Sequence, residues 1–190
     1  GDWQPPYGPW VEALGEAVAQ CEAWEGDETL GTVGRALAQL LPSLAGGAAE
    51  GRVELSPDEE QLRLFDAVAR FVLGLSAHRP LLLVLDDLHW ADGDSLLLLR
   101  YLSRFVNRGR LLVLGLHRHP DPGLAGDRPL GELLAVLRRE TDCRSLHLTG
   151  FDPAEARAYV TAVASEPLAG SQLESIQTWT GGNPFYLREL

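Results

Sequence analysis

Residues 81–87 read Leu-Leu-Leu-Val-Leu-Asp-Asp, five apolar residues followed by two carboxylates. Turn-forming residues at 78–80 precede this run. A short segment that is apolar without alternation, and bounded by turn signals, is typical of a strand buried on both faces, as in a parallel sheet. In open α/β sheets, ligands bind beyond the carboxyl ends of the strands. The run therefore predicts a buried strand over 81–85 that presents Asp86 and Asp87 at a ligand-binding edge.

The chain on either side of this segment alternates helices and strands. Ser56 as a cap and Pro57 in the first turn begin a predicted helix that reaches about residue 77. The further expected helices cover 9–24, 30–41, 94–107, 129–140, 152–164, 170–180 and 185–190. The further expected strands cover 111–116 and about 144–149. This alternation predicts an α/β domain with a parallel sheet over residues 1–150, followed by a helical region over 151–190.

Composition excludes several classes of function. The formal net charge of the 190 residues is −11, and all 16 basic side chains are Arg. A domain that grips a nucleic-acid backbone usually shows a basic face, so direct nucleic-acid binding is not expected. Cys21 and Cys143 lie far apart without a metal-ligand spacing and are predicted to be reduced thiols. No signal peptide is evident and the apolar run at 81–85 is too short to span a bilayer, so a cytoplasmic protein without a membrane partner is expected.

The two acids that end the predicted strand have two interpretations. As a Walker B pair, Asp86 would hold Mg²⁺ directly or through water, and Asp87 would orient or polarise the attacking water. Alternatively, both acids only end the strand or cap the next helix. A histidine beside two acids could also act as a base, but we interpret His89 as structural. We expect Trp90 to pack against its neighbours and His89 to hydrogen-bond to nearby backbone.

The sequence around these acids resembles a known family. Residues 86–105, DDLHWAD followed by GDSLLLLRYLSRF, are similar to the Walker B segment of STAND ATPases, which are AAA+-like P-loop NTPases found in large LuxR-type transcriptional regulators and beside nucleotide cyclase domains. YGPWVEAL at 7–14 resembles the segment after that family's second strand. LLVLGLHRHPD at 111–121 resembles its sensor 1 strand. LHLTGFDPAEARAYV at 146–160 resembles its last core strand and lid entry, and TGGNPFYLREL at 180–190 resembles its lid motif.

The resemblance implies roles for individual residues. Asp86 would be the Mg²⁺-associated acid, Asp87 the water-orienting acid, and Arg118 the sensor of the γ-phosphate. The residues that would bring the lid against the adenine are Gly181, Gly182 and Pro184. The implied cofactors are ATP or ADP with Mg²⁺. Simpler interpretations remain open, with Arg118 as a solvated loop residue and the GGNP segment as a helix-breaking turn.

The chain departs from the family at the phosphate-binding loop. It holds no GxxxxGK[ST] segment and has no Lys to reach a phosphate. The family's sheet order is 5-1-4-3-2, and the strands expected here correspond to three, four and five, with the first two strands missing. Strand one would lie between five and four. We therefore expect a gap with an exposed apolar face beside the strand at 111–116, and either marginal stability or a last strand that pairs elsewhere.

These features predict a fragment of an ATP-dependent signalling regulator. Nucleotide would close the lid onto the core and gate an output domain further along the polypeptide, and hydrolysis would reset the switch. The expected partners are nucleotide, the upstream Walker A segment, the downstream output domain and, on nucleotide binding, further copies in an oligomer. The chain alone is not expected to hydrolyse ATP. The alternatives are a degenerate, non-catalytic NTPase-like scaffold for protein partners, and an AAA-like module of a nucleotide cyclase regulator.

Overall fold

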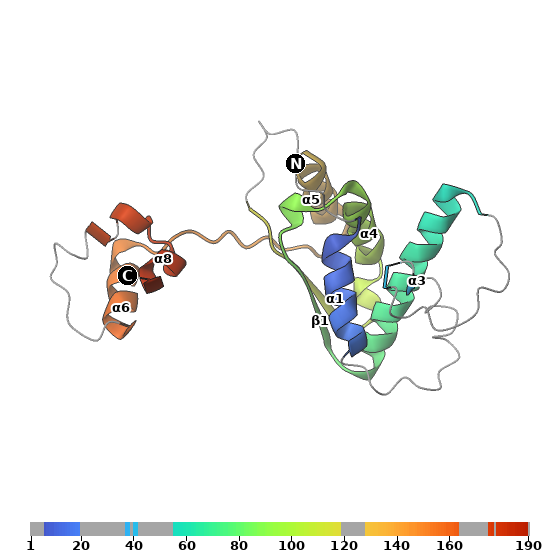
Figure 1. Ribbon diagram of the computed structural model, residues 1–190, viewed down its shortest axis with the longest axis horizontal. Coiled ribbons are helices and arrows are strands. Elements are labelled where there is room, and N and C mark those ends of the chain that lie inside the picture. The colour runs from blue at the N-terminus through green and yellow to red at the C-terminus, as the bar shows by residue number, and fades with distance from the viewer. Residues whose placement is uncertain are drawn as a thin grey trace. The chain divides into compact units, whose positions relative to one another are not determined.

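The computed structural model describes most of the chain in seven stretches (Figure 1). They are residues 6–19, 37–38, 40–41, 55–118, 128–163, 175–176 and 178–189. The chain divides into two compact units, Gly1–Cys143 and Arg144–Leu190. Cys21 and most of the helix predicted over 30–41 lie outside the described residues.

A two-stranded parallel sheet lies at the centre of the first unit. Strand β1 covers Leu81–Leu85, as predicted, and strand β2 covers Leu111–Gly115. The register pairs Leu81 with Leu111 at one end and Leu85 with Gly115 at the other. Helices precede β1 and connect it to β2, which is the usual construction of a parallel pair. This mixture of helices with a small parallel sheet is compatible with an AAA-like α/β fold.

The prediction of a third strand near 144–149 is wrong. Residues 142–152 form neither helix nor strand, and from Arg144 onward this segment belongs to the second unit. Its alternating leucines, Leu146 and Leu148, are highly exposed, Leu146 at 84%. Alternation alone does not make a strand, because the backbone groups of a strand must pair with a neighbour. In the described part of the chain, the sheet consists of β1 and β2 only.

The described helices of the first unit pack with the sheet in one hydrophobic cluster. They are α1 at Gly8–Ala19, α3 at Pro57–His78, α4 at Gly93–Ser103 and α5 at Arg128–Glu140. The cap predicted for α3 is present, because Ser56 and Glu59 satisfy each other's backbone N–H groups in a capping box. The helix expected over 94–107 is shorter than predicted, and a separate 3-10 turn, η3 at Val106–Arg108, follows it.

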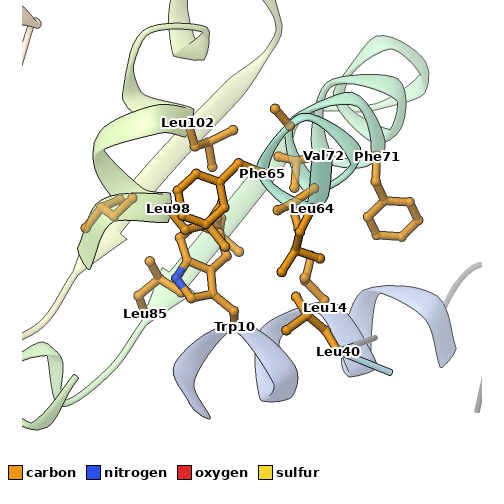
Figure 2. Packing of buried hydrophobic residues seen from close by; sticks show 14 of the residues in the cluster. Trp10, Leu14, Leu40, Leu64, Phe65, Phe71, Val72, Leu85, Leu98 and Leu102 are labelled. Carbon is orange, nitrogen blue, oxygen red and sulfur yellow. The ribbon is translucent and has the colours of Figure 1, made fainter. Parts of the chain in front are cut away.

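One hydrophobic cluster holds α1, α3, α4, α5 and the sheet together. Figure 2 shows Trp10 of α1 facing Phe65 of α3, Leu85 of β1 and Leu98 of α4. Trp10 is completely buried and its indole N–H donates to the carbonyl of Ser95, 3.1 Å away. Burying such a ring with its polar atom paired contributes a large part of the packing energy. This cluster fixes α1 against the carboxyl end of β1.

Only one face of the sheet is covered by described residues. Leu83 and Leu85 point into the cluster, whereas Leu82 is 56% exposed. The exposed face consists of Leu82, Val84, Leu112 and Leu114. The prediction that β1 is buried on both faces therefore fails for this face, because the described helices contribute to the cluster that holds Leu83 and Leu85. The gap expected beside the strand at 111–116, left by a missing strand, is a separate feature and stays a prediction.

The second unit is helical. Helix α6 at Pro153–Val163 and helix α8 at Pro184–Glu189 pack through Ala156, Val160 and Leu187. The helix predicted over 170–180 is described only at 175–176 and 178–180, which are helical. Among the described residues, no helix has both the length and the apolarity needed to cross a bilayer.

Candidate functional site

Asp86 and Asp87 follow the last residue of β1 and are both exposed. Asp87 has a left-handed backbone, with φ 51° and ψ 37°, a conformation that Asp adopts more readily than most residues. Its N–H donates to Oδ1 of Asp86 over 2.7 Å. This hydrogen bond orients the Asp86 carboxylate, and the left-handed residue turns the chain sharply away from the strand direction.

The end of β2 fixes the turn that follows the two acids. This turn, η2, covers Leu88–Trp90. The N–H of Leu88 donates to the carbonyl of Leu116, and the N–H of Leu116 donates to the carbonyl of Leu85, each over 2.9 Å. The Leu88 side chain is buried against Gly115, where an added Cβ would lie 2.6 Å from Leu88 Cδ1. Gly115 therefore provides the space that lets the turn dock on the sheet.

An open cleft of about 480 Å³ lies between α1 and the end of β1. Its lining includes four carboxylates, those of Glu12, Glu16, Asp86 and Asp87. The volume is in the range of small-molecule sites. Among the described residues, no group of three or more His, Cys, Asp or Glu side chains could hold a metal by itself. Mg²⁺ usually takes one or two carboxylates and completes its shell with water and phosphate, so the exposed, oriented carboxylate of Asp86 fits this ion.

The two residues after Leu88 differ from their predictions. Trp90 was predicted to pack; it contacts the ring of His89, but it is 62% exposed and lines the cleft. His89 has the more buried side chain, yet neither ring nitrogen has a hydrogen-bond partner, so the predicted bond to nearby backbone is absent. The exposure of Trp90 follows from the 3-10 geometry of η2, in which successive side chains point about 120° apart. With Leu88 in the core, the side chain of Trp90 points towards the cleft.

Asp92 was not predicted as a site residue, and it joins two elements of the site. It is the N-cap of α4, and its Oδ1 accepts the N–H of Ser95 over 2.9 Å. Its Oδ2 accepts the Ser95 hydroxyl over 2.6 Å and the N–H of Tyr7 over 3.0 Å. An Asp before a helical pattern signals a cap. The bond to Tyr7 crosses 85 residues of sequence and has no local signal.

Opposing effects act on the ionisation of Asp92. Burial raises the pKa of this carboxyl, but the hydrogen bonds from the Ser95 hydroxyl, the Ser95 N–H and the Tyr7 N–H act in the other direction. Together they lower the pKa below its ordinary value, because each donor stabilises the charged form. The network therefore works best with an ionised Asp92, which ties the start of α1, one wall of the cleft, to the start of α4.

The other predicted site residues lie elsewhere. Arg118 is exposed, beyond the end of β2, and is not among the described residues that line the cleft. In the second unit, Gly181 and Gly182 form a turn with φ values of 59° and 74°. The carbonyl of Gly182 accepts the N–H of Phe151 over 2.8 Å. Pro184 begins α8 directly after this turn and is exposed.

Comparison with known proteins identifies the family. The model of the AAA ATPase domain family matches residues 2–114, which is more than half of the chain. The match includes the cleft, β1 and the two acids, and it ends before Arg118 and the second unit. Neither the curated proteins nor the solved structures gave a match to this chain. AAA ATPase domains are nucleotide-binding domains and typically use Mg²⁺, so the match indicates a nucleotide-binding, ATPase-like function. The chain belongs to the AAA ATPase domain family.

Proposed function

We propose that the chain supplies the magnesium and hydrolysis side of an ATP site in a cytoplasmic, STAND-type signalling or transcriptional regulator. The observation that carries this proposal is the pair Asp86 and Asp87, which follows a parallel strand and lines a cleft of about 480 Å³. An apolar strand that ends in acids at a nucleotide-sized cleft is the arrangement that P-loop NTPases use to hold Mg²⁺. The match to the AAA ATPase domain family includes both acids.

Within this proposal each acid has a separate role. Asp86, whose Oδ1 accepts the N–H of Asp87, holds Mg²⁺ directly or through water. Mg²⁺, when bound with ATP, would neutralise charge on the phosphates. Asp87 has an exposed side chain beside the cleft and orients the attacking water. Arg118 contacts the γ-phosphate. Its guanidinium is always charged and is suited to a negative charge that is spread over several oxygens.

The remaining parts of the site lie outside the described cleft. These 190 residues hold no GxxxxGK[ST] segment, and in this proposal the phosphate-binding loop is supplied by another segment. Residues 1–150 form the core part and residues 151–190 begin the lid. The turn of Gly181, Gly182 and Pro184 brings that lid against the adenine. Nucleotide-dependent closure then controls an output domain, and further copies assemble when nucleotide binds.

Nucleotide titration tests this function. Fluorescent ATP and ADP are titrated with Mg²⁺ into the chain as given, and into a version extended upstream by about 100 residues, the size of the rest of a core domain. We expect binding and hydrolysis in the extended version only. Asp86→Ala should then lower the Mg²⁺-dependent rate by about 100-fold, the usual effect of losing one electrostatic group in an active site. Glu132→Ala, an exposed acid on α5, is the matched control and should leave the rate unchanged.

The exposed face of the sheet supports a second candidate, a non-catalytic scaffold for protein partners. Leu82, Val84, Leu112 and Leu114 form an apolar patch, and such patches mark interaction surfaces. If neither version binds nucleotide, the ATPase proposal fails and the scaffold is favoured. A module of a nucleotide cyclase regulator would share the ATP site and differ in the attached domain.

A further inference from the structure

The imidazole of His89, in the turn that follows Asp87, is a buried polar side chain that the proposed function does not use. Only 8% of the side chain is exposed. Neither Nδ1 nor Nε2 has a hydrogen-bond partner. Buried polar atoms of folded proteins are nearly always paired, and an exception calls for an explanation. The ring also contacts that of Trp90, at a centroid distance of 5.4 Å, so aromatic packing fixes its position.

The nearest charged group to this ring is the carboxylate of Asp87. His89 Nδ1 lies 3.7 Å from Asp87 Oδ1. The Asp87 side chain is 72% exposed, so it is free to rotate, whereas the imidazole is held by its surroundings. Hydrogen bonds of this type are normally below about 3.2 Å, a distance that a small rotation of the Asp87 carboxylate would reach. A fixed donor therefore lies within reach of a mobile acceptor.

We propose that His89 is a positioning residue for Asp87. The Nδ1–H tautomer donates to the Asp87 carboxylate and holds it in one orientation beside the cleft. The inference rests on the proposed function, in which Asp87 orients the attacking water. A histidine that fixes a carboxylate in this way acts as outer-shell support, because it limits the directions in which the carboxylate can point.

The first test detects the contact in the 190-residue chain without any activity measurement. Long-range ¹H–¹⁵N spectra of the histidine rings identify which nitrogen carries the proton, and His89→Gln assigns the signal. We expect a protonated Nδ1 in the wild type, and a change to the Nε2–H tautomer in Asp87→Ala. Asp86→Ala is the matched control and should leave the His89 signal in place. An Nε2–H ring in the wild type, or a ring that ignores Asp87→Ala, overturns the inference.

The second test separates positioning from packing in the extended chain. His89→Leu removes the donor and should lower kcat by about 10- to 100-fold, as losses of outer-shell partners usually do, with KM changed less than about threefold. His89→Gln retains a donor and should recover much of kcat. In an Asp87→Ala background, His89→Leu should have no further effect, because the partner is already gone. Equal effects of the Leu and Gln variants, or independent effects of the two positions, contradict the inference.

The two tests also separate this inference from the proposed function. If hydrolysis does not depend on Asp86 while the ring responds to Asp87→Ala, the proposed ATPase function is refuted and the contact stands alone. If hydrolysis depends on Asp86 but neither the ring nor kcat links His89 to Asp87, the function stands and the positioning role is refuted.

Discussion

Replacing Asp92 with alanine would remove the carboxylate that joins α1 to α4. The variant loses the N-cap of α4, which contributes about 1 kcal/mol to helix stability. It also leaves the N–H of Tyr7 and the hydroxyl of Ser95 without their acceptor, each worth about 1 kcal/mol when partly buried. Because water reaches part of this site, we expect the free energy of unfolding to fall by about 2–3 kcal/mol.

Urea unfolding of the 190-residue chain, followed by circular dichroism, measures this loss. The midpoint should move to lower urea with little change in slope, because the folded state buries the same surface. The matched control is Asp58→Ala in the first turn of α3, where an exposed acid accounts for at most about 1 kcal/mol. An Asp92→Ala midpoint equal to that of the control would show that the link between α1 and α4 contributes nothing.

The pH dependence provides an independent check. The pKa of Asp92 is lowered in the folded state, so its contribution is present above the unfolded pKa of about 3.9 and is lost as pH falls through the folded pKa. The stability difference between wild type and Asp92→Asn should therefore be largest near neutral pH and should shrink below about pH 4. A difference that stays constant from pH 7 to pH 3 would refute the argument from ionisation.

Five further substitutions test local packing in three places, each by urea unfolding. Gly115→Ala should destabilise by about 1–3 kcal/mol, because the new methyl overlaps the turn η2, and an unchanged midpoint would contradict this contact. Gly182→Ala should cost more than Gly181→Ala, because both have positive φ but only the first overlaps neighbouring backbone, and equal losses would reject that explanation. Leu83→Ala should cost about 2–5 kcal/mol and Leu82→Ala less than about 1 kcal/mol, whereas similar losses would mean that both faces of β1 are buried.

Local sequence signals predicted the elements that depend on local chemistry. The apolar run at 81–85 marked β1, and Ser56 with Pro57 marked the start of α3, where the structure adds a capping box with Glu59. The two acids were placed at the strand end because a parallel sheet presents its ligands there. Each of these features depends only on residues that lie within a few positions of each other in the sequence.

Predictions that depended on distant partners did less well. A third strand was expected near 144–149, but a strand needs a neighbour that no local pattern provides. Trp90 was expected to pack, yet Leu88 is the buried residue of the turn η2 and Trp90 is largely exposed. The bond from Tyr7 to Asp92 was also invisible, because both residues have ordinary local roles.

The DDLHWAD segment contains both the acids of the candidate site and the residues that hold them in place. Asp86 lines the cleft, Leu88 anchors the turn on the sheet, and Asp92 caps α4 while it holds the start of α1. Since α1 forms the opposite wall of the cleft, a shift of α1 would strain the same short segment that orients the two acids. The position of α1 and the geometry of the acids are therefore linked through seven consecutive residues, 86–92. This linkage implies that Asp92→Ala would disturb the Asp86 side of the cleft as well as lower stability, even though Asp92 does not line the cleft.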